Sequence, residues 1–269
     1  VGIAGDARAA AAALIKRLQC RALACQQNKA QRGSKIKAEK SAWETELDKW
    51  THETDLYSLE ISKNTSYMHP RQMLRELERA MPKHAMVSTD IGNICSVSNS
   101  YLRFEQPRSM LAAMSFGNCG YAFPVACGAK VAAPDRPAIA YVGDGAWGIS
   151  LNELLTCARE KIGVSVVLFN NGQWGAEKKN HVDFYSQRYQ GVELENPSWV
   201  AVAKSFGCEG ILVDKLSDVG AALQQSVKNQ AEGKTTVLEL MVTKELGDPF
   251  RRDALSKPVR HLQKYKEYV

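Results

Sequence analysis

Short apolar runs that alternate with longer amphipathic segments dominate the sequence from residue 67 to residue 243. The runs PAIAYV, VSVVLF and TTVLELMV have the length and the continuous apolar character of strands that are buried on both faces. This alternation indicates the α/β class: a parallel sheet covered by helices on both faces. With 269 residues and 45% hydrophobic content, the chain can bury a large core.

The same patterns place the individual elements. We expect strands at residues 84–89, 137–142, 164–169, 208–213 and 235–242. We expect helices at residues 70–81, 93–104, 121–133, 147–161, 198–207 and 216–233.

The chain ahead of residue 67 has a different character. Residues 1–25 suggest a strand, a turn and an Ala-rich helix, and residues 26–66 suggest a polar linker with a short helix near Trp43 to Trp50. Residues 67–243 form the expected main domain, and residues 244–269 a basic tail. The sequence begins with Val1, in what looks like the middle of a folded unit. We therefore expect it to be part of a longer protein. No apolar run approaches the roughly 18–20 residues of a membrane helix, and the start lacks the order of a signal peptide.

Charge and cysteine content narrow the classes of partner. The net charge is +6, and residues 16–40 carry eight Lys or Arg against one acid. The sequence shows no nucleic-acid motif and no interleaved aromatic residues, so a solvated face or a small anionic substrate explains this charge better than nucleic acid. Seven cysteines without a CxxC pair indicate free thiols in a reducing cytoplasm.

Two polar motifs directly follow two of the apolar runs. Gly143-Asp144-Gly145 ends the first, and Asn170-Asn171 ends the next. If a crossover helix joins parallel strands, both motifs lie at neighbouring strand ends, where open α/β sheets bind ligands. The carboxylate of Asp144 and the amide oxygen of Asn171 are hard donors suited to Mg²⁺, and the glycines let backbone approach a phosphate. Each motif alone also occurs as an ordinary turn or loop; the spacing and context together favour a site.

The combined pattern resembles the signature of thiamine diphosphate (ThDP)-dependent enzymes, a GDG followed after about two dozen residues by NN. The resemblance implies a ThDP-binding fold, of which this chain holds the diphosphate-binding domain. It implies that Asp144, Asn171 and the carbonyl of Gln173 hold Mg²⁺. The residues that it places against the cofactor on this side are Gly143, Gly145, Ala146, Trp174 and Gly175.

Two earlier stretches carry the same resemblance. SFGNCGYAFP is similar to a family turn in which a glycine, here Gly117, faces the aminopyrimidine ring. An apolar residue of that turn, here Cys119, supports the bent cofactor; a small buried hydrophobe is the ordinary interpretation of the same cysteine. TDIGNICS matches a loop whose Gly92 and Asn93 approach the diphosphate.

Five blocks between about residue 67 and the end carry a narrower resemblance: VSTDIGNICSVSNSYLRFEQPRSM, SFGNCGYAFP, YVGDGAWG, NNGQWGAEKKNHVDFY and ELGDPFRRDALSKPVRHLQKYKEYV. Within the ThDP-dependent enzymes, these blocks resemble the sulfoacetaldehyde acetyltransferase family. The implied reaction converts sulfoacetaldehyde and phosphate to acetyl phosphate and sulfite. The implied whole is about twice as long, and residues 1–25 resemble the end of its central domain. It is expected to act as a homodimer or homotetramer and to carry an activating glutamate on a pyrimidine-binding domain. No glutamate of this chain can be assigned that role, so we expect the chain alone to be inactive.

The resemblance and the charges suggest further site residues. Glu177 stands where related decarboxylases carry a proton-transfer glutamate, and a salt bridge with a neighbouring lysine is the alternative. Anion binding is a candidate role, and solvated surface charge the alternative, for Lys178, Lys179, His181, Arg251 and Arg252.

Three other functions compete with this one. An acetolactate synthase-like lyase or carboligase would use the same cofactor with another donor. A non-catalytic module could keep the fold, although Asp144 and Asn171 argue against it. A nicotinamide dehydrogenase fits least, because no GxGxxG follows a strand with an acid about 20 residues later.

Overall fold

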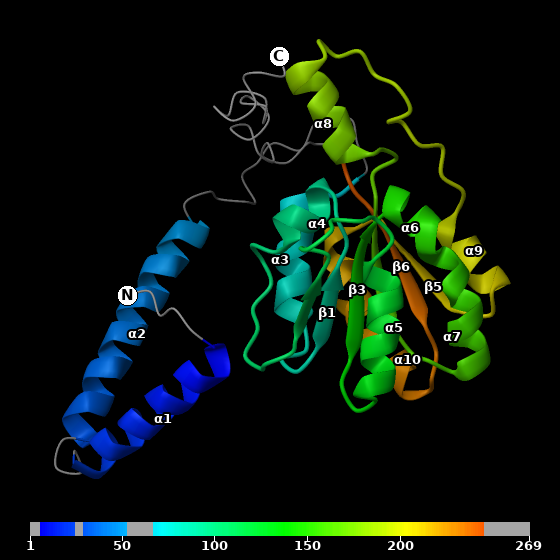
Figure 1. Ribbon diagram of the computed structural model, residues 1–269. Helices are drawn as coiled ribbons and strands as arrows, with labels where there is room; N and C mark the ends of the chain where they lie inside the picture. The colour runs from blue at the N-terminus through cyan, green and yellow to red at the C-terminus, as the bar shows by residue number, and fades with distance from the viewer. Residues whose placement is uncertain (1–5, 25–28, 53–66, 245–269) are drawn as a thin grey trace. The chain divides into compact units, whose positions relative to one another are not determined.

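The computed structural model describes residues 6–24, 29–52 and 67–244 (Figure 1). The chain divides into two units, Val1–Leu59 and Glu60–Val269, and each is described by itself. The strand expected at the start of the chain lies outside the described residues, and so do Arg251 and Arg252. The domain boundaries expected from the sequence stay a prediction.

The first unit contains two helices, α1 (Ala7–Ala24) and α2 (Lys29–His52). The side chain of Asp6 accepts a hydrogen bond from the backbone N–H of Ala9 at 2.8 Å, as an N-cap does. The expectation of a short helix near Trp43 to Trp50 was wrong in extent, since α2 has 24 residues. Its many Ala, Lys and Glu residues favour a helix although no apolar face marks one.

The second unit is built on a six-stranded, all-parallel sheet, which confirms the predicted α/β class. Its strands follow the order β2-β1-β3-β4-β6-β5. They are β1 (Met86–Thr89), β2 (Met110–Ala112), β3 (Ala138–Gly143), β4 (Ser165–Asn170), β5 (Glu209–Val213) and β6 (Thr236–Met241). Strand β2 was not expected, because three residues are too few to give a pattern.

The helices of this unit follow the prediction less closely than the strands. They are α3 (Pro70–Ala80), α4 (Asn93–Ser98), α5 (Ala122–Ala132), α6 (Asp144–Ser150), α7 (Leu154–Glu160), α8 (Gly175–Phe184), α9 (Trp199–Ser205) and α10 (Val219–Ala231). The helix expected at residues 147–161 is two helices joined by a 3-10 turn, Leu151–Glu153. Residues 176–181 were not among the expected helices but lie in helix α8.

Two apolar cores lie on opposite faces of the sheet, because successive strand residues point to opposite sides. Ile139 and Tyr141 pack on the face that α3 and α10 cover. Ala138, Ala140 and Val142 pack on the other face, where the cluster takes side chains from α5, α6, α7 and α9. The sheet is therefore covered on both sides (Figure 1).

The order of the strands fixes where a ligand would bind. From β1 the chain crosses to β2 on one side and then to β3 on the other, so the connections reverse direction between β1 and β3. At the carboxyl edge of such a reversal the loops separate and leave a crevice. Figure 1 shows α8 beyond this edge of the sheet.

Two smaller expectations can be compared with the described residues. In the described ranges, no helix has both the length and the apolar character that crossing a bilayer requires. The cysteines whose side chains are described, Cys95, Cys119, Cys127, Cys157 and Cys208, are all free thiols, as expected.

Candidate cofactor site

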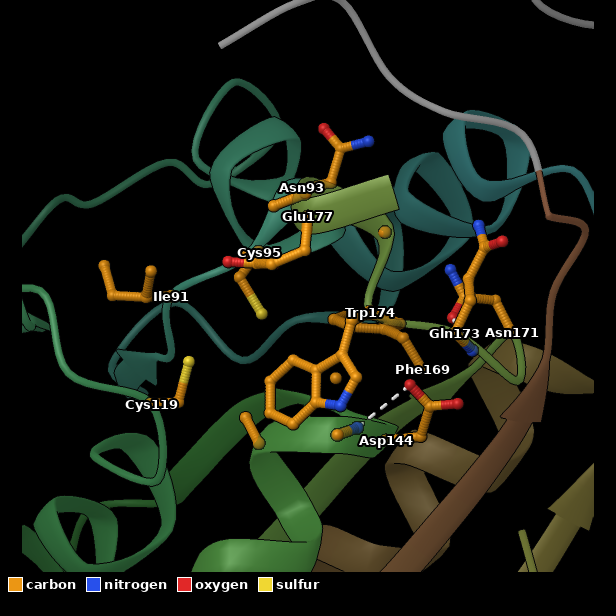
Figure 2. A pocket seen from close by; sticks show the side chains of 16 residues that line it. Ile91, Asn93, Cys95, Cys119, Asp144, Phe169, Asn171, Gln173, Trp174 and Glu177 are labelled. Atoms are coloured by element: carbon orange, nitrogen blue, oxygen red, sulfur yellow. Dashed lines mark hydrogen bonds between the residues drawn. The ribbon is translucent and has the colours of Figure 1, made fainter. Parts of the chain in front are cut away.

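A pocket lies at the carboxyl edge of the sheet, at the crevice between β1, β3 and β4 (Figure 2). Its cavity has a volume of about 60 Å³. Four segments line it: the loop and helix after β1, the turn before α5, the start of α6, and the loop and helix after β4. The lining residues include Gly92, Asn93, Cys119, Gly143, Asp144, Gly145, Ala146, Asn171, Gln173, Trp174, Gly175 and Glu177.

The two polar motifs lie side by side, as the sequence predicts. Strands β3 and β4 pair in parallel with Gly143 opposite Phe169, so each motif follows its strand at the same edge. The two segments are also in direct contact, because the backbone N–H of Gly172 donates a hydrogen bond to Oδ2 of Asp144 at 2.7 Å.

Asp144 is a buried carboxylate, only 3% exposed. Its Oδ1 accepts from the backbone N–H of Gly145 at 3.0 Å, and its Oδ2 accepts from Gly172 and from the side chain of Asn196 at 2.7 Å. Burial raises the pKa of Asp144 above its ordinary value, and these hydrogen bonds oppose the rise. The side chain is thus held in one orientation at the pocket wall.

A chain of buried and half-buried polar groups continues from Asp144. The same amide nitrogen of Asn196 also donates to Oδ1 of Asn170 at 2.9 Å. Asn170 in turn donates to Oε1 of Glu239 at 2.8 Å, and Oε2 of Glu239 accepts from the backbone N–H of Val200 at 3.0 Å. The network links the ends of β3 and β4 to strand β6 and helix α9.

Residues 192–196, here called the strap, run antiparallel to the segment that follows β4. The backbone N–H of Trp174 donates to the carbonyl of Val192 at 2.8 Å, and that of Leu194 donates to Gly172 at 2.9 Å. Gln173 and Glu193 form a bridge between these two bonds. The strap therefore fixes the backbone around Gln173, whose carbonyl is an expected metal ligand.

The amide side chains beside Asp144 offer further oxygen atoms. Oδ1 of Asn171 accepts from the backbone N–H of Gln173 at 3.2 Å, which folds the segment into a tight turn. Oε1 of Gln173 is buried without a hydrogen-bond partner. No three His, Cys, Asp or Glu side chains gather as a metal site among the described residues. A metal here would thus use one carboxylate with amide, carbonyl and ligand oxygens, a donor set that suits Mg²⁺.

Glycines on both sides of Asp144 leave the pocket wall without side chains at these positions. A Cβ atom on Gly143 would meet nothing within 4 Å, so its backbone borders open space. A Cβ on Gly145 would lie 2.7 Å from the ring of Trp174, which rests directly on that glycine. Figure 2 shows this ring between Cys119 and Asp144.

Asp90, at the end of β1, is a second buried carboxylate, also 3% exposed. It accepts hydrogen bonds from the backbone N–H groups of Ile91 at 2.9 Å, Gly120 at 3.0 Å and Ala122 at 3.0 Å. Burial raises its pKa, and these bonds oppose the rise. Asp90 joins β1 to the turn that carries Cys119 and to the start of α5.

A comparison with known protein families shows which family this chain belongs to. Residues 90–240 match the model described as "Thiamine pyrophosphate enzyme, C-terminal TPP binding domain". The chain belongs to this family.

Two curated relatives align along this whole TPP-binding chain, and both are named sulfoacetaldehyde acetyltransferase. The protein of Castellaniella defragrans is 59% identical over 275 residues and that of Alcaligenes xylosoxydans xylosoxydans 61% identical over 279. Each alignment covers 100% of this chain and 46% of the relative, so the chain spans about half their length.

Among solved structures, the thiamine diphosphate-dependent 4-hydroxybenzoylformate decarboxylase of Rhodococcus jostii RHA1 aligns with a TM-score of 0.61 and 23% identity. That alignment covers 68% of this chain and 34% of the decarboxylase, and it supports the fold.

Some of the residues predicted for the TPP-binding site lie apart from the pocket. Gly117 adopts a φ of 77° in the turn before α5 but lies outside the pocket lining. Lys178 and Lys179 lie on α8, where they form ion pairs with Glu193 and Asp183. The ring of His181, on the same helix, lies 5.9 Å from that of Tyr185.

Sequence reasoning missed the residues that hold this pocket in shape. Asn196 precedes a proline and suggests an ordinary turn, and Glu239 stands within an apolar strand. Asp90 belongs to a predicted loop but was not singled out. A charged residue inside a strand buried on both faces was the available signal, because such a charge requires a partner.

Proposed function

We propose that the protein containing this chain converts sulfoacetaldehyde and phosphate to acetyl phosphate and sulfite with ThDP and Mg²⁺. The chain supplies the diphosphate and metal half of the site. The observation that carries the proposal is the hydrogen-bonded juxtaposition of the Asp144 and Asn171 segments at the edge of β3 and β4. The shared name of two relatives that are 59% and 61% identical along the chain supports the choice of substrates.

Each part of the pocket has a role in this proposal. Asp144, Asn171 and the carbonyl of Gln173 hold Mg²⁺, which neutralises the diphosphate. Backbone at Gly92, Asn93, Gly143, Gly145 and Ala146, together with Trp174 and Gly175, contacts the diphosphate side of the cofactor. When bound, the cofactor supplies an electron sink for breaking a bond to the substrate carbon.

In this proposal, two further residues of the pocket lining act near the reacting end of the cofactor. Glu177 is exposed and lines the pocket, so it can exchange protons with a bound substrate and with solvent. Cys119 lines the same pocket, and burial raises the pKa of its thiol, which favours the neutral form. In the proposal a neutral Cys119 would pack against the cofactor, and the carbonyl of Gly117 would bind its pyrimidine ring.

The cations of α8 and the tail are proposed anion ligands: Lys178, Lys179, His181, Arg251 and Arg252. Lys178 and Lys179 already have carboxylate partners, so an anion would compete with Glu193 and Asp183 for them. Steady-state kinetics of Lys178→Ala and Lys179→Ala, with phosphate and sulfoacetaldehyde varied separately, test this. A KM shift above about threefold, roughly 0.7 kcal/mol, supports a role; smaller shifts leave both lysines as surface charges.

The proposal also concerns the rest of the protein. A pyrimidine-binding domain outside this chain would carry the activating glutamate, and the assembly would be a cytoplasmic homodimer or homotetramer. This chain alone would then bind ThDP weakly and show no turnover, because the contacts and the glutamate of that domain are missing.

Sulfite release by the intact protein tests the proposal. We expect release from sulfoacetaldehyde that requires ThDP, Mg²⁺ and phosphate, with acetyl phosphate as the second product. Activity with pyruvate but not sulfoacetaldehyde would instead indicate an acetolactate synthase-like lyase or carboligase. Absence of Mg²⁺-dependent ThDP binding would indicate a non-catalytic module.

A further inference from the structure

We propose that Asn196 is a positioning residue that fixes the spacing of the two strand ends on which the metal ligands stand. This inference rests on the proposed function, because the ligands concerned are those expected for Mg²⁺. It goes further in assigning the geometry of that site to a residue of the strap, which follows both motifs in the sequence.

The amide group of Asn196 has two N–H bonds, and the structure gives each an acceptor. One points to Oδ2 of Asp144 at 2.7 Å, and the other to Oδ1 of Asn170 at 2.9 Å. The first acceptor belongs to the motif after β3 and the second ends β4. A single planar group therefore joins the two motifs directly.

Asn196 is itself held from several directions. The backbone hydrogen bond from the N–H of Leu194 to the carbonyl of Gly172 fixes the strap two residues before it. Pro197 follows it, and a residue before proline is restricted to an extended backbone. Just beyond, Ser198 caps α9 by accepting from Ala201 at 3.2 Å. The side chain of Asn196 thus projects from a short segment anchored at both ends.

Mg²⁺ binding makes this spacing matter. Mg²⁺ requires nearly ideal octahedral geometry, so a ligand that rotates or shifts binds the ion less tightly. Groups that orient metal ligands typically contribute 10- to 100-fold in affinity. Asn196 and the N–H of Gly172 both hold Oδ2 of Asp144, which leaves Oδ1 with only the local bond to Gly145.

The side chain also suits the task chemically. Aspartate at this position would present oxygen atoms to two acceptors and repel both, and serine could donate only one hydrogen bond. Asparagine has the two donors on one nitrogen that the two acceptors require.

The test compares Asn196→Ala with Asn229→Ala in the intact protein. Asn229 is a matched control, since its amide also donates a hydrogen bond, to Oγ1 of Thr236 at 3.0 Å, but lies in α10 away from the pocket. Calorimetric titration of ThDP at a series of Mg²⁺ concentrations gives the Mg²⁺ requirement. Hydrogen–deuterium exchange without cofactor gives the protection of peptides covering residues 143–146 and 170–175.

We expect Asn196→Ala to raise the Mg²⁺ concentration needed for half-maximal ThDP binding by about tenfold or more. Saturating Mg²⁺ should restore kcat to within about twofold of wild type, a recovery that loss of the fold would not allow. Exchange should increase in both peptides. Asn229→Ala should change neither measurement.

Two outcomes separate the inference from the proposed function. If wild type binds ThDP with Mg²⁺ while Asn196→Ala shows an unchanged Mg²⁺ requirement or unchanged exchange, the inference is wrong and the function stands. If wild type shows no Mg²⁺-dependent ThDP binding, the proposed function is wrong, and the metal-positioning role falls with it.

Discussion

Asp90 and Asp144 make an instructive pair. Both follow neighbouring parallel strands, both are 3% exposed, and both accept three hydrogen bonds. All three donors to Asp90 are backbone N–H groups near the ends of β1 and α5. Asp144 instead accepts from a side chain as well as from backbone, and it lines the pocket, whereas Asp90 does not.

The difference shows that burial and pKa do not by themselves identify a functional carboxylate. Burial raises the pKa of both groups. What distinguishes Asp144 is access to the cavity next to other oxygen donors. We therefore expect Asp90 to act on stability and Asp144 on ligand binding, and mutations can separate the two.

The largest effect should come from Asp144→Ala. Loss of the carboxylate removes an expected Mg²⁺ ligand, so we expect ThDP affinity at physiological Mg²⁺ to fall more than about 100-fold. Calorimetry on the intact protein measures this, and circular dichroism checks that the fold is kept. Unchanged affinity in a folded variant would remove the distinction between the two aspartates.

Asp90→Ala should have the opposite profile. Three backbone N–H groups lose an ionised acceptor, which should lower the free energy of unfolding by about 3 kcal/mol. Denaturant unfolding of wild type and variant gives this difference. The comparison would fail if Asp90→Ala were as stable as wild type and lost ThDP binding as completely as Asp144→Ala.

Gly145→Ala tests how closely the pocket wall fits. The new methyl group would lie 2.7 Å from the Trp174 ring, so the ring must move within the pocket. We expect ThDP affinity to fall about tenfold, the equivalent of about 1.4 kcal/mol of overpacking. Gly148→Ala, in the same helix with nothing within 4 Å, is the control and should bind ThDP normally.

The pH dependence of stability should show the raised pKa of Asp90. A carboxyl with a folded pKa above its unfolded value of about 3.9 contributes most below that value, and the contribution falls as pH rises through the folded pKa. The stability difference between wild type and Asp90→Asn should therefore shrink as pH rises from about 4 to 8. Denaturant titrations across that range measure the difference. If it widens with rising pH, the hydrogen bonds lower the pKa of Asp90 by more than burial raises it.

The sequence predicted those parts of the molecule in which one pattern determines one structure. The apolar runs of β3 and β4 and the motifs that follow them were predicted, because continuous hydrophobicity and strand-end polarity are local signals. Helix α8 was missed because GAEKKNHVDF has no apolar face, and its charged residues were considered only as anion ligands or surface charge. Asn196 was missed because its partners lie 26 and 52 residues away.

The position of the strap late in the chain has a consequence for the order of assembly. Asp90 can bond to Gly120 and Ala122 once residues up to 122 are available, whereas Asp144 gains its third donor only after residue 196 has been made. During synthesis, N-terminal segments are available first. The partners of Asp90 are thus available before the third donor to Asp144, so a nascent chain could join this loop to the turn before α5 before the expected metal ligand has all its hydrogen bonds.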